Sequence, residues 1–467
     1  MAEMMKAWRI NELGKPPVME EVPIPEPTFG EILIKMKGAG MCRTDLEVID
    51  EGFITVPFEG PFTFGHENAG EVVKLGPGVD TVEVGQNVIV DTLHACGKCQ
   101  YCLSGRDNFC EVASARGLKE DGGMAEYMIA DAREVAPLGD LDPTEYVALA
   151  DAGLSPYGAV QTAKPFIPNN GTAVVIGVGG LGFYCCQYLA LTTSARVIVV
   201  NRSAEKMAKM VNYGADELVV LDDNAYDKIM ELTDGKGVDA VFDFVGRDNT
   251  LELAAQITKG LGLISILGLG GGTLPVSWTT IKPGVMVRLT QGGTITDLYE
   301  IMDLAKAGKI KVEAQQYPFS KVLDALDDLR NGRVEGRAVI TFEELQGMFD
   351  AKDIDLTKFE AESSFHNATG AGRGYAVAGG VASAIERCIN EYYPGTEVKI
   401  EHAEGLAECK KILTLAKAGE KNGCLIEGMG CPGGCVAGAG TNIPIAKAQK
   451  ALADFVKNST KPLPPKE

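Results

Sequence analysis

The sequence of 467 residues lacks several features that would point to a membrane or a nucleic acid. No stretch of it approaches the length of a membrane span, and the first residues, MAEMMKAWRI, hold no apolar core of signal-peptide length. Basic residues are in deficit, because 44 Lys and Arg face 64 Asp and Glu, which gives a formal net charge of −20. Such a surface repels nucleic acid and anionic lipid. No internal repeat is present, and we expect a soluble, cytoplasmic protein.

Cysteine is plentiful, with twelve residues, which in a reducing cytoplasm indicates metal ligands and buried thiols. Four of them lie in the run CGKCQYCLSGRDNFC, as Cys96, Cys99, Cys102 and Cys110. Four thiolates at this spacing suit a closed, tetrahedral structural Zn²⁺ site. The alternatives are a pair of disulfides, to which Cys-x-x-Cys pairs are poorly suited, and an iron–sulfur site. We favour structural zinc, which would perform no chemistry itself.

The chain is too long for one hydrophobic core, and its texture changes after about 150 residues. Residues 1–150 carry short alternating apolar runs with many glycines and prolines, which is typical of a small β-barrel-like domain. From residue 172, buried strands alternate with helices, which predicts a doubly wound parallel sheet. Its six expected strands are 173–176, 196–200, 217–221, 240–245, 263–268 and 287–290.

The remainder of the chain predicts further elements. Residues 300–340 predict helix, strand, helix and strand, ending in the apolar run RAVITF. Beyond Phe342, the sequence predicts a capped helix and a linker, because Thr341 and Glu344 stand at capping-box spacing. The last ten residues, 458–467, predict a disordered tail.

A glycine-rich segment joins the strand 173–176 to a helix, which is the context in which a GxGxxG pattern predicts a dinucleotide site. Its glycines allow a tight turn and let a pyrophosphate approach the free N–H groups at the start of the helix. The residues expected to contact the cofactor here are Gly177, Gly179, Gly180, Leu181 and Gly182.

The end of the second strand of this sheet bears on cofactor choice. An NAD-selective site places Asp or Glu there, but this chain reads Asn201-Arg202-Ser203. The neutral Asn201 does not repel a 2′-phosphate, and Arg202 can pair with one. The segment therefore favours NADP(H) over NAD(H).

Three further motifs complete a recognisable set: GMCRTD with Cys42, GHE with His66, and DAGLSPYG, which begins at Asp151. Together with the cysteine run, VIGVGGLG and the terminal GRAV, they resemble the zinc-dependent alcohol dehydrogenases of the medium-chain dehydrogenase/reductase superfamily, over residues 5–340. The chain is most similar to the bacterial secondary-alcohol dehydrogenases of that superfamily.

This resemblance implies an α/β architecture of two domains. A GroES-like β-barrel catalytic domain would span residues 1–152 and be completed by residues 291–340. A doubly wound Rossmann domain would span residues 153–290. A homo-oligomer, either a dimer or a tetramer, is expected with it.

The resemblance also implies a catalytic zinc held by Cys42, His66 and Asp151, with Glu67 as an occasional fourth ligand. One thiolate, one imidazole and one carboxylate leave a position open for the substrate oxygen. Zinc there would lower the pKa of the alcohol and, in the reverse direction, polarise the carbonyl. With the cysteine run, two zinc ions per chain are expected.

Three other roles come from the same resemblance. Thr44 would take the alcohol proton and pass it towards ribose hydroxyls and solvent. Arg43 and Arg337 would contact the cofactor pyrophosphate. Residues 290–293, Thr-Gln-Gly-Gly, replace the bulky aromatics of close relatives, which predicts a roomier and more polar substrate pocket.

Residues 341–457 match nothing in an alcohol dehydrogenase. The segment EGMGCPGGCVAGAG and the segment HNATGAGRGYAVAGGV upstream resemble the C-terminal part of the catalytic domain of iron-only hydrogenases, which implies an extra α+β module. Cys431 and Cys435 would correspond to the two final cluster ligands of that family. The two earlier motifs, TSCxP and MPCxxK, are absent from the sequence, although a cubane cluster needs four cysteines. Cys388 and Cys409 stand at positions that predict helix.

Three interpretations of this module remain open: a structural or docking remnant, a cluster site completed by a redox partner, and an accidental fusion. For the whole chain we expect a zinc- and NADP(H)-dependent enzyme that interconverts a secondary alcohol or polyol with its ketone, a small-molecule substrate. One alternative is a redox or electron-transfer component in which the CPGGC module binds an iron–sulfur cluster with a partner. The other is a zinc-independent quinone or enoyl reductase.

Overall fold

The computed structural model describes residues 3–52, 60–342, 380–397, 399–404, 406–421 and 424–429, and single positions 449, 450, 452, 453 and 457. The predicted helix and linker after Phe342, Cys431, Cys435 and the predicted tail lie outside the described residues. The chain forms two units, residues 1–352 and 353–467.

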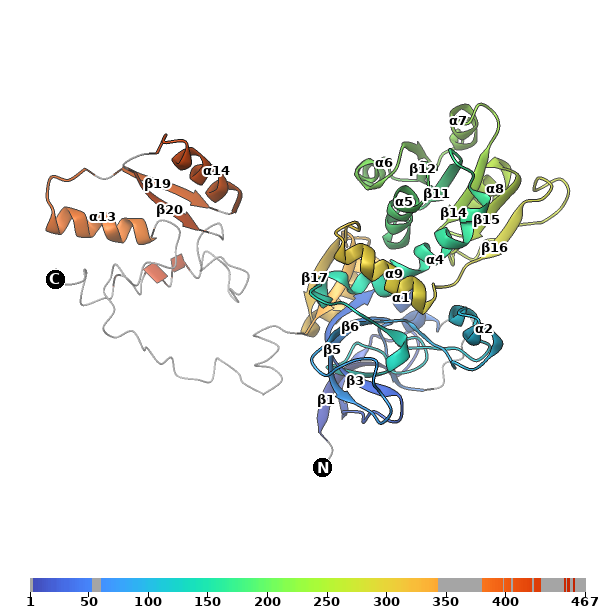
Figure 1. Ribbon diagram of the computed structural model, residues 1–467, viewed down its shortest axis with the longest axis horizontal. Coiled ribbons are helices and arrows are strands. Elements are labelled where there is room, and N and C mark those ends of the chain that lie inside the picture. Colours follow the sequence, from blue (N-terminus) through green and yellow to red (C-terminus); the bar gives the residue numbers. More distant parts are fainter. Residues whose placement is uncertain are drawn as a thin grey trace. The chain divides into compact units, whose positions relative to one another are not determined.

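The first unit (Figure 1) starts with two largely antiparallel sheets. One has the strand order β2-β1-β4, and the larger one has the order β10-β6-β5-β3-β18-β17 with β9 paired to β3. The bounds of these strands are β1 Met4–Ile10, β2 Val18–Pro23, β3 Glu31–Met41, β4 Phe62–Thr63, β5 Glu67–Leu75, β6 Asn87–Val90, β9 Tyr127–Asp131, β10 Val135–Pro137, β17 Ala314–Pro318 and β18 Arg337–Thr341. A short antiparallel pair, β7 Leu93–His94 and β8 Ser114–Ala115, flanks the cysteine run.

Strand β3 organises the larger sheet because its apolar residues alternate. Ile32, Ile34 and Met36 are fully buried, so one face of the strand packs into a core with the strands β5, β6 and β9. Its far end pairs antiparallel with β18, with Met41 opposite Ala338. The chain thus returns after some 300 residues to complete the sheet in which the metal-binding motifs begin.

A further sheet of the unit has the order β13-β12-β11-β14-β15-β16 and is parallel throughout, which confirms the predicted doubly wound topology. Its strands are β11 Thr172–Ile176, β12 Arg196–Asn201, β13 Glu217–Val220, β14 Val238–Asp243, β15 Thr258–Ile266 and β16 Met286–Leu289. Strand β15 begins five residues before the predicted start at 263. A register shift and Leu261 at φ +65° interrupt it, so its early part shows no apolar run.

Alternating side chains of β11 reach opposite layers of this unit. Ala173 and Val175 pack with helices α4 and α5, whereas Val174 and Ile176 pack with α7 and α8. The helices of the unit are α1 Arg43–Asp50, α2 Gln100–Leu103, α3 Pro143–Tyr146, α4 Leu154–Ala163, α5 Gly180–Thr192, α6 Ala204–Ala208, α7 Ala225–Leu232, α8 Asp248–Ile257, α9 Ile295–Lys306 and α10 Val322–Arg330. The predicted order of helix, strand, helix and strand after residue 300 is confirmed by α9, β17, α10 and β18.

In the second unit, the described residues form α13 Gly380–Tyr392, β19 Lys399–Glu404, α14 Leu406–Lys417 and β20 Cys424–Met429. The strands β19 and β20 are parallel, and α14 connects them. Glu427 of β20 accepts hydrogen bonds from the backbone N–H groups of Val381 and Ala382, at 2.9 and 3.3 Å, in the first turn of α13. Cys388 and Cys409 lie in α13 and α14, as predicted.

Among the described helices of both units, none combines the length and the apolar character that crossing a bilayer requires.

Candidate metal and cofactor sites

Three potential metal ligands meet where β3, β5 and the 151–154 turn converge. Cys42 ends β3 and caps α1, His66 precedes β5, and Asp151 precedes α4. The Cys42 Sγ lies 3.2 Å from His66 Nε2, and His66 Nε2 lies 3.6 Å from Asp151 Oδ2. Ligands of a tetrahedral zinc with bonds of about 2.0–2.3 Å stand roughly 3.5 Å apart. The donor set and its spacing therefore fit a zinc ion.

Asp45 orients this cluster, although it was not among the predicted site residues. Its Oδ1 lies 3.0 Å from His66 Nδ1, and its Oδ2 accepts from the backbone N–H of Cys42 at 2.8 Å. A carboxylate on Nδ1 leaves Nε2 of the imidazole to face the cluster, as in many metal-binding histidines. The signal that could have found it is an acidic residue at the third helical position after Cys42, where it reads as an ordinary capping-box residue.

The cluster is electrostatically suited to a cation. Burial opposes the imidazolium form of His66, but Asp45 and Cys42 outweigh it and raise the pKa of His66 well above its ordinary value. Burial likewise opposes ionisation of Asp151, yet His66 and Arg337 hold the pKa of Asp151 at about 2. Groups that stabilise positive charge on His66 would also stabilise a bound metal ion.

Glu67 and Arg337 form a buried ion pair behind the cluster. Arg337 Nε donates to Glu67 Oε2 at 2.9 Å, a second guanidinium N–H bonds Oε1, and the backbone N–H of Ala152 donates to Oε1 at 3.2 Å. Arg337 Nη2 also lies 3.8 Å from Asp151 Oδ2. A Cβ atom on Gly180 would stand 2.9 Å from Arg337 Nη1, so the guanidinium reaches from the metal cluster to the glycine-rich loop. Both Glu67 as an occasional ligand and Arg337 as a pyrophosphate contact stay predictions.

The other two residues of the GMCRTD motif lie in the first turn of α1. The backbone N–H of Thr44 donates to Cys42 Sγ at 3.1 Å, which places Thr44 against the cluster. Arg43 is exposed, and its Nε lies 3.8 Å from Glu47. Their roles in proton transfer and pyrophosphate binding stay predictions.

The four-cysteine lobe, residues 95–111, brings its sulfur atoms together. All four ligand atoms lie within 4.8 Å of one another, with 3.5 Å between the sulfurs of Cys99 and Cys102. All four are free cysteines, so neither disulfide of the alternative interpretation is formed. Backbone N–H groups of Cys102 and Glu111 lower the pKa of Cys99 to about 6, which favours the thiolate that a metal needs.

A third cluster near this lobe, His94, Asp131 and Glu134, is a charge network. Hydrogen bonds to Asp131 and Glu120 raise the pKa of His94 to about 10. Arg116 in turn donates to Glu134 at 3.1 Å. The carboxylates of Asp131 and Glu134 thus already have partners within the protein.

The glycine-rich loop has the geometry of a dinucleotide turn. Gly177 adopts φ +89°, a conformation that L side chains rarely take. A Cβ on Gly182 would stand 1.9 Å from the carbonyl oxygen of Gly177, whereas one on Gly179 would meet only open space. Helix α5 begins at Gly180, so its free N–H groups face that space. Leu181 is in the first turn of α5.

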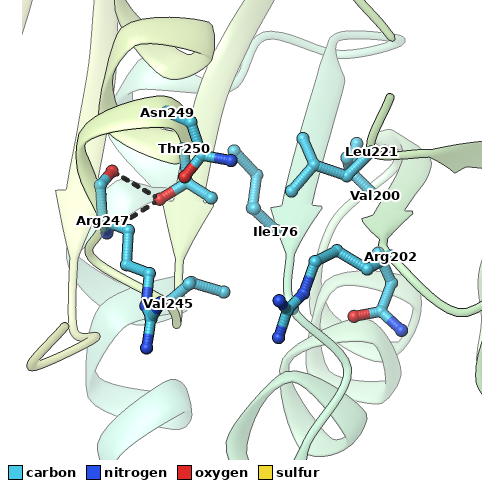
Figure 2. Close-up of a pocket in the computed structure, with 10 residues that line it drawn as sticks. Ile176, Val200, Arg202, Leu221, Val245, Arg247, Asn249 and Thr250 are labelled. Carbon is cyan, nitrogen blue, oxygen red and sulfur yellow. Dashed lines mark hydrogen bonds between the residues drawn. The ribbon is translucent and has the colours of Figure 1, made fainter. Parts of the chain in front are cut away.

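Figure 2 shows a pocket beside this loop, between the ends of β11, β12 and β14. Arg202 and Arg247 extend along its two sides. Asn201 Nδ2 donates to the carbonyl of Ser203 at 3.3 Å, and Ser203 Oγ caps α6 by accepting from Lys206 N, also at 3.3 Å. Arg247 was not among the predicted site residues; the signal available was an arginine four residues after the fourth strand, at the same sheet edge as Arg202. The lining residues are Ile176, Gly177, Val200, Asn201, Arg202, Leu221, Val245, Arg247, Asn249 and Thr250.

Three family models match the chain. Residues 28–140 match the alcohol dehydrogenase GroES-like domain, and residues 180–307 match the zinc-binding dehydrogenase family. Residues 311–439 match the C-terminal domain of the iron-only hydrogenase large subunit. This third match begins before β17 and thus includes β17, α10 and β18. The strands β17 and β18 complete the larger antiparallel sheet of the dehydrogenase unit.

Curated relatives cover the first unit. D-arabinose 1-dehydrogenase (NADP(+)) from Saccharolobus solfataricus is 35% identical over 72% of this chain and 97% of its own length. The NAD-dependent alcohol dehydrogenase of Sulfolobus acidocaldarius is 31% identical over 72% of this chain and 99% of its own length.

Solved structures give the same picture. The alcohol dehydrogenase of Aeropyrum pernix matches with a TM-score of 0.67 and 33% identity, over 72% of this chain and 99% of that one. The D-arabinose dehydrogenase of Sulfolobus solfataricus matches with a TM-score of 0.65 and 31% identity, over 73% of this chain and 99% of that one. The chain therefore belongs to the zinc-containing alcohol dehydrogenases of the medium-chain dehydrogenase/reductase superfamily, with an added segment related to the iron-only hydrogenases.

Proposed function

We propose that the chain interconverts a secondary alcohol or polyol with its ketone, with zinc and NADP(H) as cofactors. The observation that carries this proposal is the cluster of Cys42, His66 and Asp151, which Arg337 connects to the glycine-rich loop. The residues that would bind a metal ion and the loop that would bind a pyrophosphate thus both lie close to the buried guanidinium of Arg337. Measuring NADPH oxidation with a panel of ketones, and NADP⁺ reduction with the matching alcohols, tests it.

Within this proposal, Cys42, His66 and Asp151 hold the catalytic zinc, which supplies a Lewis acid for the alcohol or carbonyl oxygen. Asp45 keeps Nε2 of His66 directed at the cluster through its contact with Nδ1. Arg337 holds Glu67 and lies close to Asp151, which fixes the carboxylates on that side of the site. Thr44, next to the cluster, takes the proton of the alcohol and passes it towards ribose hydroxyls and solvent.

A second zinc in the four-cysteine lobe is part of the same proposal. Four free thiols within 4.8 Å of one another, on a lobe with no buried apolar helix of its own, suit a closed structural site. Metal analysis of the purified chain would find about two zinc ions if both sites are filled.

The preference for NADP(H) rests on the pocket in Figure 2. Its two sides carry Arg202 and Arg247, in a chain whose net charge is −20, and no acidic residue lines it. The exposed guanidinium of Arg202 makes no ion pair with any residue in the described part of the chain. Two unneutralised cations beside the adenosine end of a dinucleotide site favour the cofactor that carries a 2′-phosphate.

Replacing Arg202 by alanine should lower kcat/KM with NADPH by about tenfold or more and leave NADH almost unaffected, because a charge-assisted phosphate contact is worth roughly 1.5–3 kcal/mol. Steady-state kinetics with both cofactors measures this. Lys206→Ala is the matched control, since Lys206 is an exposed cation on α6 outside the pocket lining. An unchanged NADPH to NADH ratio in Arg202→Ala would show that another residue sets the preference.

The oligomer is proposed to be a dimer or tetramer of this chain. Strand β16 is the edge of the parallel sheet, and large apolar side chains near it are exposed, among them Trp278 at 88% and Leu289 at 76%. A sheet edge with apolar neighbours is a surface that proteins normally cover.

We also propose the limits of three domains: residues 1–152 with 291–340 for the catalytic domain, 153–290 for the Rossmann domain, and 341–457 for the C-terminal module.

The C-terminal module is proposed to be a structural or docking remnant without a cluster of its own. Cys431 and Cys435, four positions apart, would supply two of the four ligands that a cubane needs, and Cys388 and Cys409 lie in helices of the described part. The alternative is a cluster that a redox partner completes.

Ending the chain at Lys352, the limit of the first unit, should leave kcat within about twofold, because every candidate site residue of the dehydrogenase lies before that point. The full-length protein, purified anaerobically, should contain far less than one iron cluster and evolve no hydrogen from reduced viologen. Iron analysis, hydrogen evolution and kcat of both chains decide the question. A stoichiometric cluster, or loss of kcat in a well-folded truncated chain, would show that the module takes part in function.

A further inference from the structure

We propose that the four-cysteine lobe positions the segment 288–295, and through it one side of the substrate pocket, by way of Asp107 and Asn108. The lobe was expected to be a structural landmark only. Its contacts with a segment almost 190 residues further along the chain give it a second role.

Three consecutive lobe residues, just before Cys110, bind the segment directly. Asp107 Oδ2 accepts from the backbone N–H of Ile295 at 3.1 Å, and Asn108 Nδ2 donates to the carbonyl of Gln291 at 3.0 Å. Phe109 lies under the guanidinium of Arg288, 5.6 Å from its ring centre. The segment is thus fixed at its start, middle and end.

The bond to Ile295 acts at the start of a helix. Ile295 is the first residue of α9, and its N–H has no acceptor within the helix. Thr294 and Asp297 form the capping box of α9, so Asp107 adds an acceptor from a different part of the fold. A negative charge at this end is also favoured by the helix dipole. Asp107 therefore fixes where the 12-residue helix α9 begins.

The burial of Asn108 leaves one of its side-chain polar atoms without a hydrogen bond to any described residue. Asn108 is 9% exposed, and its Oδ1 has no hydrogen-bond partner in the described part of the chain. Leaving a buried acceptor unpaired costs free energy. The hydrogen bond from Asn108 Nδ2 to Gln291 therefore comes with a free-energy cost, which indicates that Asn108 serves to position the segment rather than to add stability.

The segment also packs against the segments that carry two metal ligands. A Cβ on Gly292 would lie 3.4 Å from Leu93 Cδ1, and the neighbouring Thr92 donates to the carbonyl of His66 at 2.9 Å. A Cβ on Gly293 would lie 2.6 Å from Leu154 Cδ1, three residues after Asp151.

The segment therefore contacts both the cysteine lobe and the segments that carry His66 and Asp151, and Cβ atoms on its two glycines would clash with or touch these neighbours. A lobe that loosens would let residues 290–293 move away from the cluster. Because the sequence assigns these residues to the substrate pocket, the expected effect is on substrate size, with the chemistry of the cluster left intact. This inference rests on the proposed function for the identity of the pocket, but not for the contacts themselves.

The test uses the full-length, zinc-loaded protein and three variants for hydrogen exchange, Asp107→Ala, Asp107→Asn and Glu111→Ala, with Asn108→Ala added for the kinetics. Asparagine keeps an acceptor oxygen for Ile295 N–H. The side chain of Glu111 accepts from Gln100 within the lobe, at 2.9 Å, and alanine keeps the backbone N–H of residue 111, which makes Glu111→Ala the matched control. Loss of one hydrogen bond to a carboxylate should speed exchange of the Ile295 amide hydrogen about tenfold in Asp107→Ala. The other two variants should stay within about threefold of the unaltered protein.

Kinetics supply the second readout. The ratio of kcat/KM for 1-phenylethanol to that for 2-propanol should rise about fivefold in Asp107→Ala and Asn108→Ala, mainly through KM, because the pocket gains room. Zinc content should be unchanged in all variants, which separates a lost contact from a collapsed lobe.

Unaltered exchange at Ile295 together with an unaltered substrate ratio in Asp107→Ala would overturn the inference, as would an equal effect of Glu111→Ala. If the unaltered protein oxidised no secondary alcohol, the proposed function would be wrong. The exchange of the Ile295 amide would still decide whether the lobe positions the segment.

Discussion

Replacing His66 by alanine is expected to abolish alcohol oxidation, with a loss of at least about 10³-fold in kcat/KM, because removing one of three ligands takes away the catalytic metal. Zinc should fall from about two equivalents to about one, since the four-cysteine lobe stands apart from the cluster and keeps its own ion. Inductively coupled plasma analysis and steady-state kinetics on the same preparation measure both quantities.

Two other variants are compared with His66→Ala. His402→Ala removes an exposed histidine of the second unit and should change neither zinc content nor turnover. Asp45→Asn keeps a side-chain oxygen near His66 Nδ1 but loses the charge, so it should retain zinc less tightly, by about 10–100-fold in affinity. Turnover close to that of the unaltered protein in His66→Ala would reject the assignment of this cluster.

The sequence predicted well those features that local pattern determines. Short buried apolar runs located the strands of the parallel sheet, and glycines at fixed spacing between strand and helix located the turn at Gly177. Strand β15 shows the limit of this approach. Its first residues are lysine and glycine around Leu261 at positive φ, and only pairing with β14 makes them a strand.

The features that could not be predicted are contacts between distant residues. In the local sequence Asp45 reads as an ordinary capping residue, and only the fold brings it into contact with His66. Arg337 likewise reads as a strand residue, and only the fold brings it close to Glu67 and Gly180. Asp107 is separated from Ile295 by 188 positions, and nothing in either local sequence indicates the bond. Such contacts depend on how the strands, helices and loops of the unit are placed in space, which a single sequence does not encode in its local periodicity.

In the hydrogenase-like segment, the motif was predicted from the sequence but the start of the similarity was not. The sequence motif was recognisable, and the match to the hydrogenase family confirms it, but the segment that matches begins at residue 311 rather than 341. Residues 311–342 are therefore part of a dehydrogenase sheet and also of a hydrogenase-like match, with β18 paired to β3. A boundary drawn from motifs alone falls where the dehydrogenase pattern stops, which is not where the other similarity starts.

Replacing Arg337 by methionine is expected to destabilise the first unit by about 3–5 kcal/mol, because it leaves the buried Glu67 without its ionic partner. Burial already raises the pKa of Glu67, and Arg337 is the largest influence that lowers it. In the variant, Glu67 would bind a proton more readily in the folded than in the unfolded state. Stability then falls as the pH rises through the folded pKa, so the deficit should be larger at pH 8 than at pH 5.

Urea unfolding followed by tryptophan fluorescence measures this, because both tryptophans, Trp8 and Trp278, lie in the first unit. Adding Glu67→Gln to Arg337→Met should restore more than half of the lost stability, since no uncompensated charge then remains on residue 67. Arg330→Met is the matched control: its ion pair with Asp50 is exposed, and losing it should cost no more than about 1 kcal/mol. Equal losses in Arg337→Met and Arg330→Met, or a deficit that does not change with pH, would mean that the Glu67 carboxylate does not depend on this guanidinium.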